Sequence, residues 1–228
     1  MKLSIPCSIC LEESPQGSKS ACDAILRDDF TYEVTCSKGH KSICIHSNPK
    51  FDVLYVYAKH AIESGFLREA VGSFSACIER YYEFFLRVKL RSEGKNFDDI
   101  DRLWKMVSSQ SERQLGAYIF SYFSHYGEPP IILRQNLVEF RNKVVHKGYI
   151  PTPKEVNKFN EAVLQIVGTG IQRLQTEQLE YVLDVISKEY ESIKYDSETS
   201  FLSELNVVTP SLANALNNYL CAEESKEP

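Results

Sequence analysis

The sequence lacks any apolar run long enough to cross a bilayer, and its first residues, MKLSIPCSIC, lack the apolar centre of a secretory signal. Glycine (10) and proline (9) are not enriched among the 228 residues, and we find neither an internal repeat nor a low-complexity tract. This composition is typical of a soluble globular protein. We therefore expect a cytoplasmic chain with no membrane segment.

The chain carries no excess of positive charge, because its formal net charge is −5. A protein coated with nucleic acid on all sides would be basic, so this class is disfavoured, although a local basic patch is compatible with the total. Hydrophobic residues make up 43% of the 228 residues, which is enough for one or two domains with a sizeable core.

Cysteine is the residue type that the sequence does have in an informative pattern. The seven cysteines are Cys7, Cys10, Cys22, Cys36, Cys44, Cys77 and Cys221. Their number is odd and five of them precede position 45, which favours metal binding over a disulfide framework.

Two chelating pairs stand out in this cluster, Cys7-x2-Cys10 and Cys36-x3-His40. Together they predict a closed, tetrahedral Cys3His site, for which zinc is the natural metal. Cys44 or His46 could replace a member of the second pair, and reduced cysteines without a metal are the alternative. A polar segment of this size needs such a staple to fold.

The hydrophobic pattern of the sequence changes near residue 50. Residues 28–36, DDFTYEVTC, alternate like a β-strand, whereas period-3.6 patterns begin at Phe51. The expected helices cover residues 51–65, 66–94, 97–107, 112–126, 131–147, 152–173 and 176–194, with a last short helix from Thr209. The predicted fold is mainly α: a β-containing zinc-ribbon-like module (1–50), a helical bundle (51–175) and a C-terminal helical extension with a disordered tail (176–228).

Capping residues define several of these helix ends. Asn96 is expected to cap the helix that follows it, and Ser111 is expected to form a capping box with Gln114. Thr152, Pro153 and Glu155 combine an N-cap, a first-turn proline and a capping glutamate.

The stretch EFRNKVVHKG, residues 139–148, gathers an arginine, an asparagine and a histidine at the end of one helix. Gln135, Glu139, Asn142 and His146 share a helix face, while Leu137, Phe140 and Val144 form the opposite, apolar face. A solvated polar face is one explanation. The other is a site for RNA phosphodiester cleavage.

The residue types suit that chemistry. His146 can transfer the proton of a 2′-hydroxyl or of a leaving 5′-oxygen, Arg141 can bind the phosphate, and Asn142 can orient His146 or the 2′-hydroxyl. Between Arg134 and Lys158 six basic and two acidic side chains give a net charge of +4. Such a local patch could hold phosphates.

The motif RNKVVH, its exit KGYIPTPKE and the order of the surrounding helices resemble the HEPN superfamily of helical domains, over residues 51–175. That family is marked by Arg-x4–6-His at the end of a helix. Arg141 and His146 match its two defining positions, and Asn142 matches the polar residue that often follows the arginine.

The resemblance implies a metal-independent endoribonuclease, in which two protomers pair to form one composite RNA-cleaving site. Products would carry 2′,3′-cyclic phosphate and 5′-hydroxyl ends. Many relatives are bacterial toxins or act in abortive infection, a form of phage defence. Glu139, Lys147 and Tyr149 are supporting candidates, as are the more distant Glu79 and Glu83; a neutralising or regulatory protein partner is also expected.

Two other functions stay open from the sequence. One is a non-catalytic helical dimerisation or adaptor module whose zinc head binds a protein or nucleic-acid partner. The other is a zinc-dependent nucleic-acid-binding regulator, although no expected helix is basic enough for a clear major-groove reader.

Overall fold

The computed structural model describes residues 7–13, 22–46, 48–191 and 200–203. Their contacts divide the chain into two compact units. The sheet unit contains the described parts of Met1–Asn48 and Lys188–Val208, and the helical unit contains Pro49–Ser187. The last short helix expected from Thr209 lies outside the described residues.

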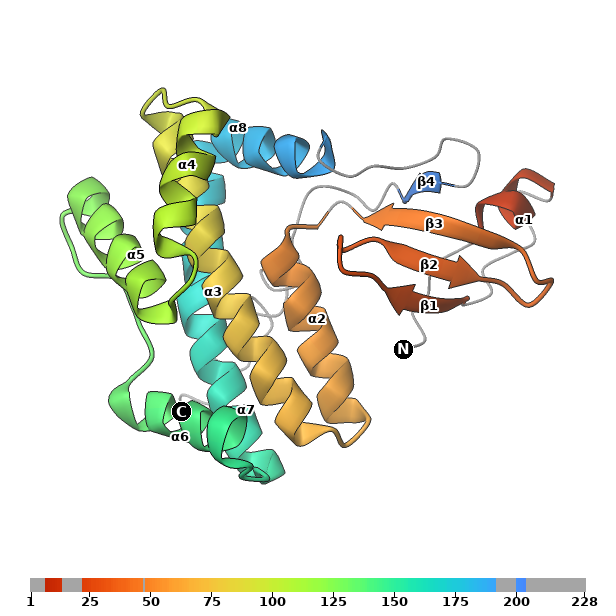
Figure 1. The fold of residues 1–228 in the computed structure, drawn as a ribbon, viewed down its shortest axis with the longest axis horizontal. Coiled ribbons are helices and arrows are strands. Elements are labelled where there is room, and N and C mark those ends of the chain that lie inside the picture. The colour runs from red at the N-terminus through yellow and green to blue at the C-terminus, as the bar shows by residue number, and fades with distance from the viewer. Residues whose placement is uncertain (1–6, 14–21, 47, 192–199, 204–228) are drawn as a thin grey trace, which may run out of the picture. The chain divides into compact units, whose positions relative to one another are not determined.

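The sheet unit is a short helix and a four-stranded sheet (Figure 1). Its elements are α1 (Ser8–Glu13), β1 (Asp23–Leu26), β2 (Tyr32–Thr35), β3 (Lys41–His46) and β4 (Ser200–Ser203). The strand order is β1-β2-β3-β4, and the first three strands are antiparallel. Strand β4 is parallel to β3, with Ile43 opposite Ser200. A segment from the far end of the chain therefore completes a sheet that begins at its start.

The strand expected over residues 28–36 is wrong in its first half. Residues 28–31 form the turn between β1 and β2, and Phe30 adopts a positive φ of 63° there. Asp29 holds this turn, because its carboxylate accepts hydrogen bonds from the backbone N–H and the hydroxyl of Thr31 at 3.0 and 2.6 Å. The alternating pattern runs through the turn, so the pattern alone does not locate it.

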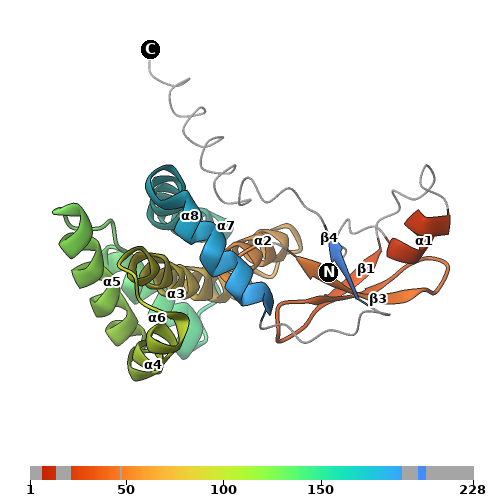
Figure 2. The ribbon, with the colours of Figure 1, turned by 90° about the horizontal axis from the view of Figure 1, so that it is seen from above.

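The helical unit confirms the mainly α prediction. Its elements are α2 (Lys50–Glu63), α3 (Leu67–Ser92), α4 (Phe97–Val107), α5 (Ser111–Tyr126), α6 (Gln135–Lys147), α7 (Pro153–Val163), the π-helical turn η1 (Leu164–Gly168) and α8 (Thr169–Glu191). Helix α3 lies between α2 on one side and α5 on the other (Figures 1 and 2). Within the described residues, no helix combines the length and apolar character that a membrane crossing requires.

The boundary expected near residue 175 falls inside α8. That helix has a kink at Gln178, whose φ of −141° is not helical, and it continues to Glu191. Residues 176–187 thus pack with the helical unit, and the chain returns to the sheet unit after them.

Two of the three expected caps are confirmed. The Asn96 side chain accepts from the Asp99 backbone N–H, and the Thr152–Glu155 capping box is complete. The box expected at Ser111 is wrong: Gln110 is the N-cap, and the Ser111 hydroxyl donates to Oε1 of Glu79 at 2.7 Å instead. The Ser111 hydroxyl, which the local sequence predicts to cap the helix end, therefore bonds to a distant acceptor on α3.

Aromatic side chains fill the core of the helical unit around α3. Tyr81 lies edge-on to Phe51 and Tyr118, and Phe85 stacks on Tyr122. At the start of α8, Gly170 lets Tyr81 approach the backbone: a β-carbon at this position would lie 2.6 Å from the Tyr81 Cζ. The absence of a side chain at Gly170 thus makes room for the Tyr81 ring in the core.

Replacing Gly170 with alanine should destabilise the helical unit, since the added methyl overlaps the fully buried Tyr81 ring. Overpacking of this kind costs about 1–3 kcal/mol and occasionally more. The measurement is urea unfolding followed by circular dichroism. Gly116→Ala in α5 is the matched control, because its new β-carbon meets nothing within 4 Å and alanine favours a helix. Equal midpoints for both variants would contradict the argument.

Candidate functional site

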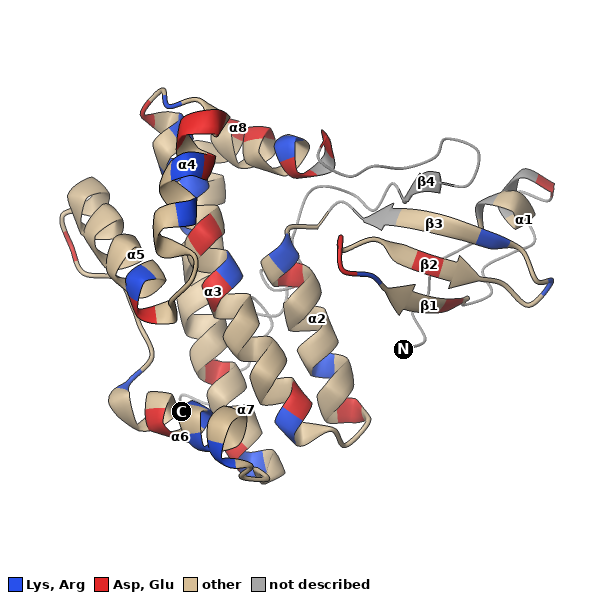
Figure 3. Cartoon of the chain, viewed as in Figure 1, with Lys and Arg blue, Asp and Glu red and all other residues tan. Residues whose placement is uncertain are grey.

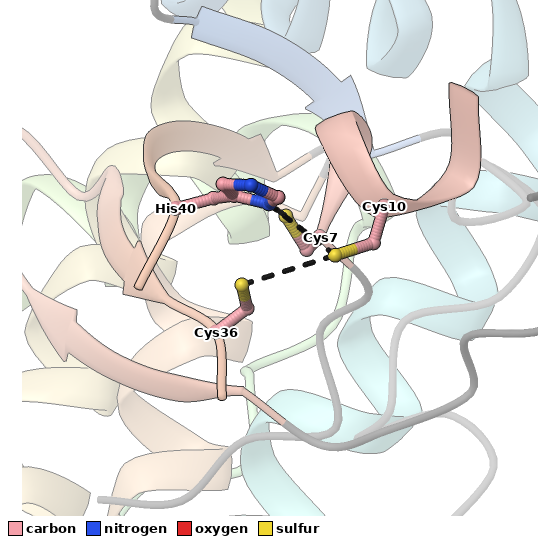
Figure 4. Close-up of side chains that lie close together, drawn as sticks. All are labelled: Cys7, Cys10, Cys36 and His40. Carbon is pink, nitrogen blue, oxygen red and sulfur yellow. Dashed lines mark hydrogen bonds between the residues drawn. The ribbon is translucent and has the colours of Figure 1, made fainter. Parts of the chain in front are cut away.

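Four side chains of the sheet unit converge on one point, as the two sequence pairs predicted (Figure 4). The sulfurs of Cys7, Cys10 and Cys36 and a ring nitrogen of His40 all lie within 4.8 Å of one another. The Cys10 sulfur is 3.9 Å from the Cys36 sulfur and 3.4 Å from Nδ1 of His40, and Cys7 is 3.8 Å from the same nitrogen. This group could hold a metal ion.

Local structure explains why the four groups meet. The second pair sits in a tight turn after β2, in which the Gly39 N–H donates to the Cys36 carbonyl at 2.9 Å and Gly39 takes a φ of 85°. The first pair is carried by the start of α1. Lys38 of the turn forms an ion pair of 3.0 Å with Glu13 at the end of α1, which ties the two pieces together.

The thiols respond differently to this environment. Burial and the neighbouring thiols of Cys7 and Cys36 raise the pKa of Cys10 to about 11. Burial also opposes ionisation of Cys36, but the backbone N–H groups of His40 and Lys38 stabilise its thiolate and lower its pKa. A turn that directs N–H groups at a sulfur is suited to a thiolate ligand.

The alternative ligands considered from the sequence are placed as follows. Cys44 is fully buried in β3. Cys22 is also buried, and its burial, followed by the neighbouring Cys7 and Cys36, raises its pKa. Neither belongs to the converging group among the described residues. The side chain of His46 lies outside the described residues.

The motif helix α6 lies across the N-terminal end of α3 in the helical unit (Figure 1). Leu137 and Val144 are buried and Phe140 packs against the core, as the expected apolar face requires. Gly148 ends α6 in the left-handed conformation, with φ of 70°. Arg68 of α3 donates to the Val144 and Val145 carbonyls at 3.2 and 3.5 Å, a stabilising contact that the sequence did not indicate.

Arg141 projects from α6 into a cavity of about 120 Å³ between α3, α5 and α6. Ile78, Glu79 and Leu115 are among the other residues that line it. Burial raises the pKa of Tyr82, and the negative charge of Glu79 raises it further. The positive charge of Arg141 acts in the opposite direction and lowers the pKa of Tyr82. The cavity therefore joins an apolar wall to one cationic side chain, Arg141, and two anionic ones, Glu79 and Glu112.

Arg141 differs from the other half-buried arginines. Arg80, Arg87, Arg91 and Arg173 each contact a carboxylate at 3.0 Å or less, whereas no carboxylate pairs with Arg141 in the described part of the chain. Removing a guanidinium from water without an anionic partner is unfavourable. An anion from outside the chain would satisfy it.

His146 is exposed and does not line this cavity. On an ideal helix, five positions correspond to about 7.5 Å of rise and a rotation of about 140°, so Arg141 and His146 leave α6 in different directions. Asn142 is half-buried, and within the described ranges it forms no hydrogen bond with His146. The polar stripe that includes His146 is present, but Arg141 lies on a different face of α6 from His146.

The supporting candidates have structural partners or lie exposed. The Glu139 carboxylate accepts from Gln135 at 3.3 Å, and Lys147 is exposed. Tyr149 donates its hydroxyl to Glu155 at 3.0 Å, which raises its pKa, and its ring meets Phe140 edge-on. Of the two candidate carboxylates on α3, Glu83 is paired with Arg80 and Arg87, while Glu79 lines the cavity.

Positive charge gathers around this site in the helical unit (Figure 3). Arg134, Lys143, Lys147, Lys154 and Lys158 are all exposed on or beside α6 and α7. An exposed basic surface next to an unpaired arginine is suited to a polyanion.

No protein-family model, no curated protein and no solved structure matches this chain.

Proposed function

We propose that the helical unit is a metal-independent endoribonuclease of the HEPN type. The observation that carries this proposal is the half-buried Arg141 guanidinium. It has no carboxylate partner among the described residues, and it lines a cavity five residues before an exposed histidine. Phosphate is an anion that a guanidinium binds in forked geometry. The basic surface of α6 and α7 would bind the neighbouring phosphates.

The reaction assigned to these groups needs no metal. The 2′-oxygen of one ribose attacks the adjacent phosphorus as a base takes its proton, and the bond to the 5′-oxygen breaks as an acid protonates that leaving group. His146 is the proton-transfer group, Arg141 stabilises the charge that builds on the phosphate oxygens, and Asn142 orients either the histidine or the ribose. The products are a 2′,3′-cyclic phosphate and a 5′-hydroxyl.

We propose that two copies of the chain form the site together. The different directions of Arg141 and His146 on α6 favour a site in which one copy supplies the arginine and the other the histidine. Val145 and Ile150, on either side of His146 in the sequence, are exposed apolar residues that a second copy would cover. A homodimer would thus be required for activity.

For the sheet unit we propose a structural zinc ion. Zinc holds thiolates at about 2.3 Å in a tetrahedron, which separates neighbouring sulfurs by about 3.8 Å. The 3.9 Å between the Cys10 and Cys36 sulfurs fits that spacing. Four protein ligands leave no position for a substrate, so the ion would stabilise the sheet rather than take part in catalysis.

The biological setting that we propose is a bacterial toxin or abortive-infection system in the cytoplasm, directed at cellular or phage RNA. An unrestrained ribonuclease would damage its own cell. A neutralising or regulatory protein partner is therefore part of this proposal.

The decisive experiment is a cleavage assay on mixed cellular RNA with the purified protein in excess EDTA, followed by end-group analysis. We expect nicked RNA with 2′,3′-cyclic phosphate and 5′-hydroxyl ends. Intact RNA at all protein concentrations, with zinc and without it, would contradict the proposal, and 5′-phosphate ends would assign a different mechanism.

A second candidate is a non-catalytic dimerisation or adaptor module, which the surface of α4 and α5 favours. Phe120 is 79% exposed and Met106 is 67% exposed, and an apolar cavity of about 300 Å³ lies between α3, α4 and α5. Exposed apolar side chains at this density are typical of surfaces that bind a partner. Under this function, Phe120→Ser should abolish the effect of the protein in cells and His146→Ala should not; the ribonuclease proposal expects His146→Ala to abolish it.

A further inference from the structure

The cavity beside Arg141 has apolar walls that can receive the edge of a flat ring. Its volume is about 120 Å³, less than the about 150 Å³ of an apolar cavity that holds benzene, so a base would enter it by one edge rather than be enclosed. Ile78, Leu115 and Val138 supply apolar wall atoms on three different helices. A nucleobase would bury its faces against them, as bases do against apolar and aromatic side chains.

Two carboxylates line this cavity, the half-buried Glu79 and the exposed Glu112. Glu79, the less exposed of the two, is the group that can distinguish one base from another. Its Oε1 accepts the Ser111 hydroxyl at 2.7 Å, which fixes the orientation of the carboxylate. Within the part of the chain that the structure describes, no side chain donates to its other oxygen, Oε2. The cavity therefore presents an oriented, partly unused acceptor to an incoming ring.

An ionised carboxylate accepts hydrogen bonds and donates none, so it selects a base with adjacent donors. Guanine presents two such donors on one edge, its N1–H and its 2-amino group. Adenine and cytosine place a ring nitrogen acceptor beside their amino group, and uracil flanks its single N–H with two carbonyl oxygens. A mismatched acceptor would face the carboxylate and be left unpaired.

We propose that this cavity is a guanine pocket, in which Glu79 accepts from N1–H and the 2-amino group while Arg141 binds the phosphate attached to the 3′-oxygen of the same nucleotide. The inference rests on the proposed ribonuclease function and deepens it, because it assigns cleavage to the bond that follows guanosine. Glu79 is here a specificity residue, and its role does not depend on the proton transfer at His146.

The test is a binding titration of the full chain with the 3′-monophosphates of guanosine, adenosine, cytidine and uridine, followed by calorimetry or NMR. The guanosine nucleotide should bind at least about tenfold more tightly than the other three, since two hydrogen bonds to a charged acceptor distinguish it. Glu79→Gln should remove this preference, and Glu161→Gln, an exposed acid on α7 outside the cavity, should retain it. Glu79→Asp keeps the charge but shortens the side chain, and should weaken guanosine binding in a protein with wild-type circular dichroism.

Equal affinities for the four nucleotides, or a guanosine preference that survives Glu79→Gln, would overturn the pocket. If Glu79→Gln fails to fold, Glu79→Asp decides the same point. Guanosine selectivity in a protein that leaves RNA intact would support the pocket and remove the ribonuclease. RNA cut equally after all four bases would do the reverse.

Discussion

Replacing His146 with alanine should lower the rate of RNA cleavage by about 10²–10⁴-fold, the usual contribution of a positioned acid or base. His146 is exposed and does not line the cavity beside Arg141, so its removal leaves the core unchanged and the unfolding midpoint should stay that of the wild type. The measurement is initial cleavage rate in EDTA beside a thermal melt of the same preparation.

The matched control is His60→Ala. His60 is a partly exposed histidine on α2 whose Nδ1 lies 3.3 Å from the Glu63 carboxylate, and its loss should leave cleavage unchanged. If His146→Ala and His60→Ala cut RNA equally fast, His146 has no role in the chemistry and the activity belongs elsewhere.

A mixing experiment separates a composite site from a site within one chain. Arg141→Ala and His146→Ala are each expected to be inactive. By two-fold symmetry, each dimer holds two equivalent pairings of Arg141 from one copy with His146 from the other. In an equal mixture that exchanges subunits, half of the dimers contain one copy of each variant, and one of their two pairings regains both residues. Activity should therefore return to about a quarter of the wild-type value, as two-fold symmetry requires. Mixtures as inactive as the single variants would place both residues in one chain or outside the reaction.

The second large effect is expected from Cys36→Ser, which should remove the metal ion and unfold the sheet unit. Structural zinc contributes on the order of 10 kcal/mol to the folding of small domains at neutral pH. The described strands have four to six residues each, which is a small core to hold without a metal. Elemental analysis should find one zinc per wild-type chain and none in the variant, with loss of amide protection in β2 and β3.

Cys44→Ala is the control for this second prediction. Cys44 is as buried as the three converging cysteines but lies outside their group, so the variant should keep its zinc. Full metal content in Cys36→Ser, or a wild-type chain that keeps its protected sheet in EDTA without metal, would show that the four side chains serve another purpose.

Local sequence was sufficient where one short stretch decides the structure. The Asn96 cap, the Thr152–Glu155 box and the glycine after α6 were all predicted because their partners lie within three or four residues. The Cys and His pairs were found for the same reason, since each pair occupies one turn.

Prediction from sequence failed where a distant residue competes. Ser111 bonds to Glu79, 32 positions away, and β4 is formed by four residues whose pairing partner is β3 at the other end of the chain. The cavity beside Arg141 is likewise built from separate helices. A motif that places Arg141 and His146 five residues apart did not show that Arg141 lines this cavity and His146 does not. Helical rotation was the one local signal available, and it indicates different faces for the two residues.

The parallel pairing of β4 with β3 has a consequence for how the protein is made. Synthesis adds about 5–20 residues per second, so β4 leaves the ribosome roughly 10–30 s after β3. During that interval the hydrogen-bonding edge of β3 is open to strands of other chains, including identical chains on the same messenger. The last step in completing the sheet therefore waits for the whole helical unit to be translated, and chains released early would expose an unpaired edge by which quality control could recognise them.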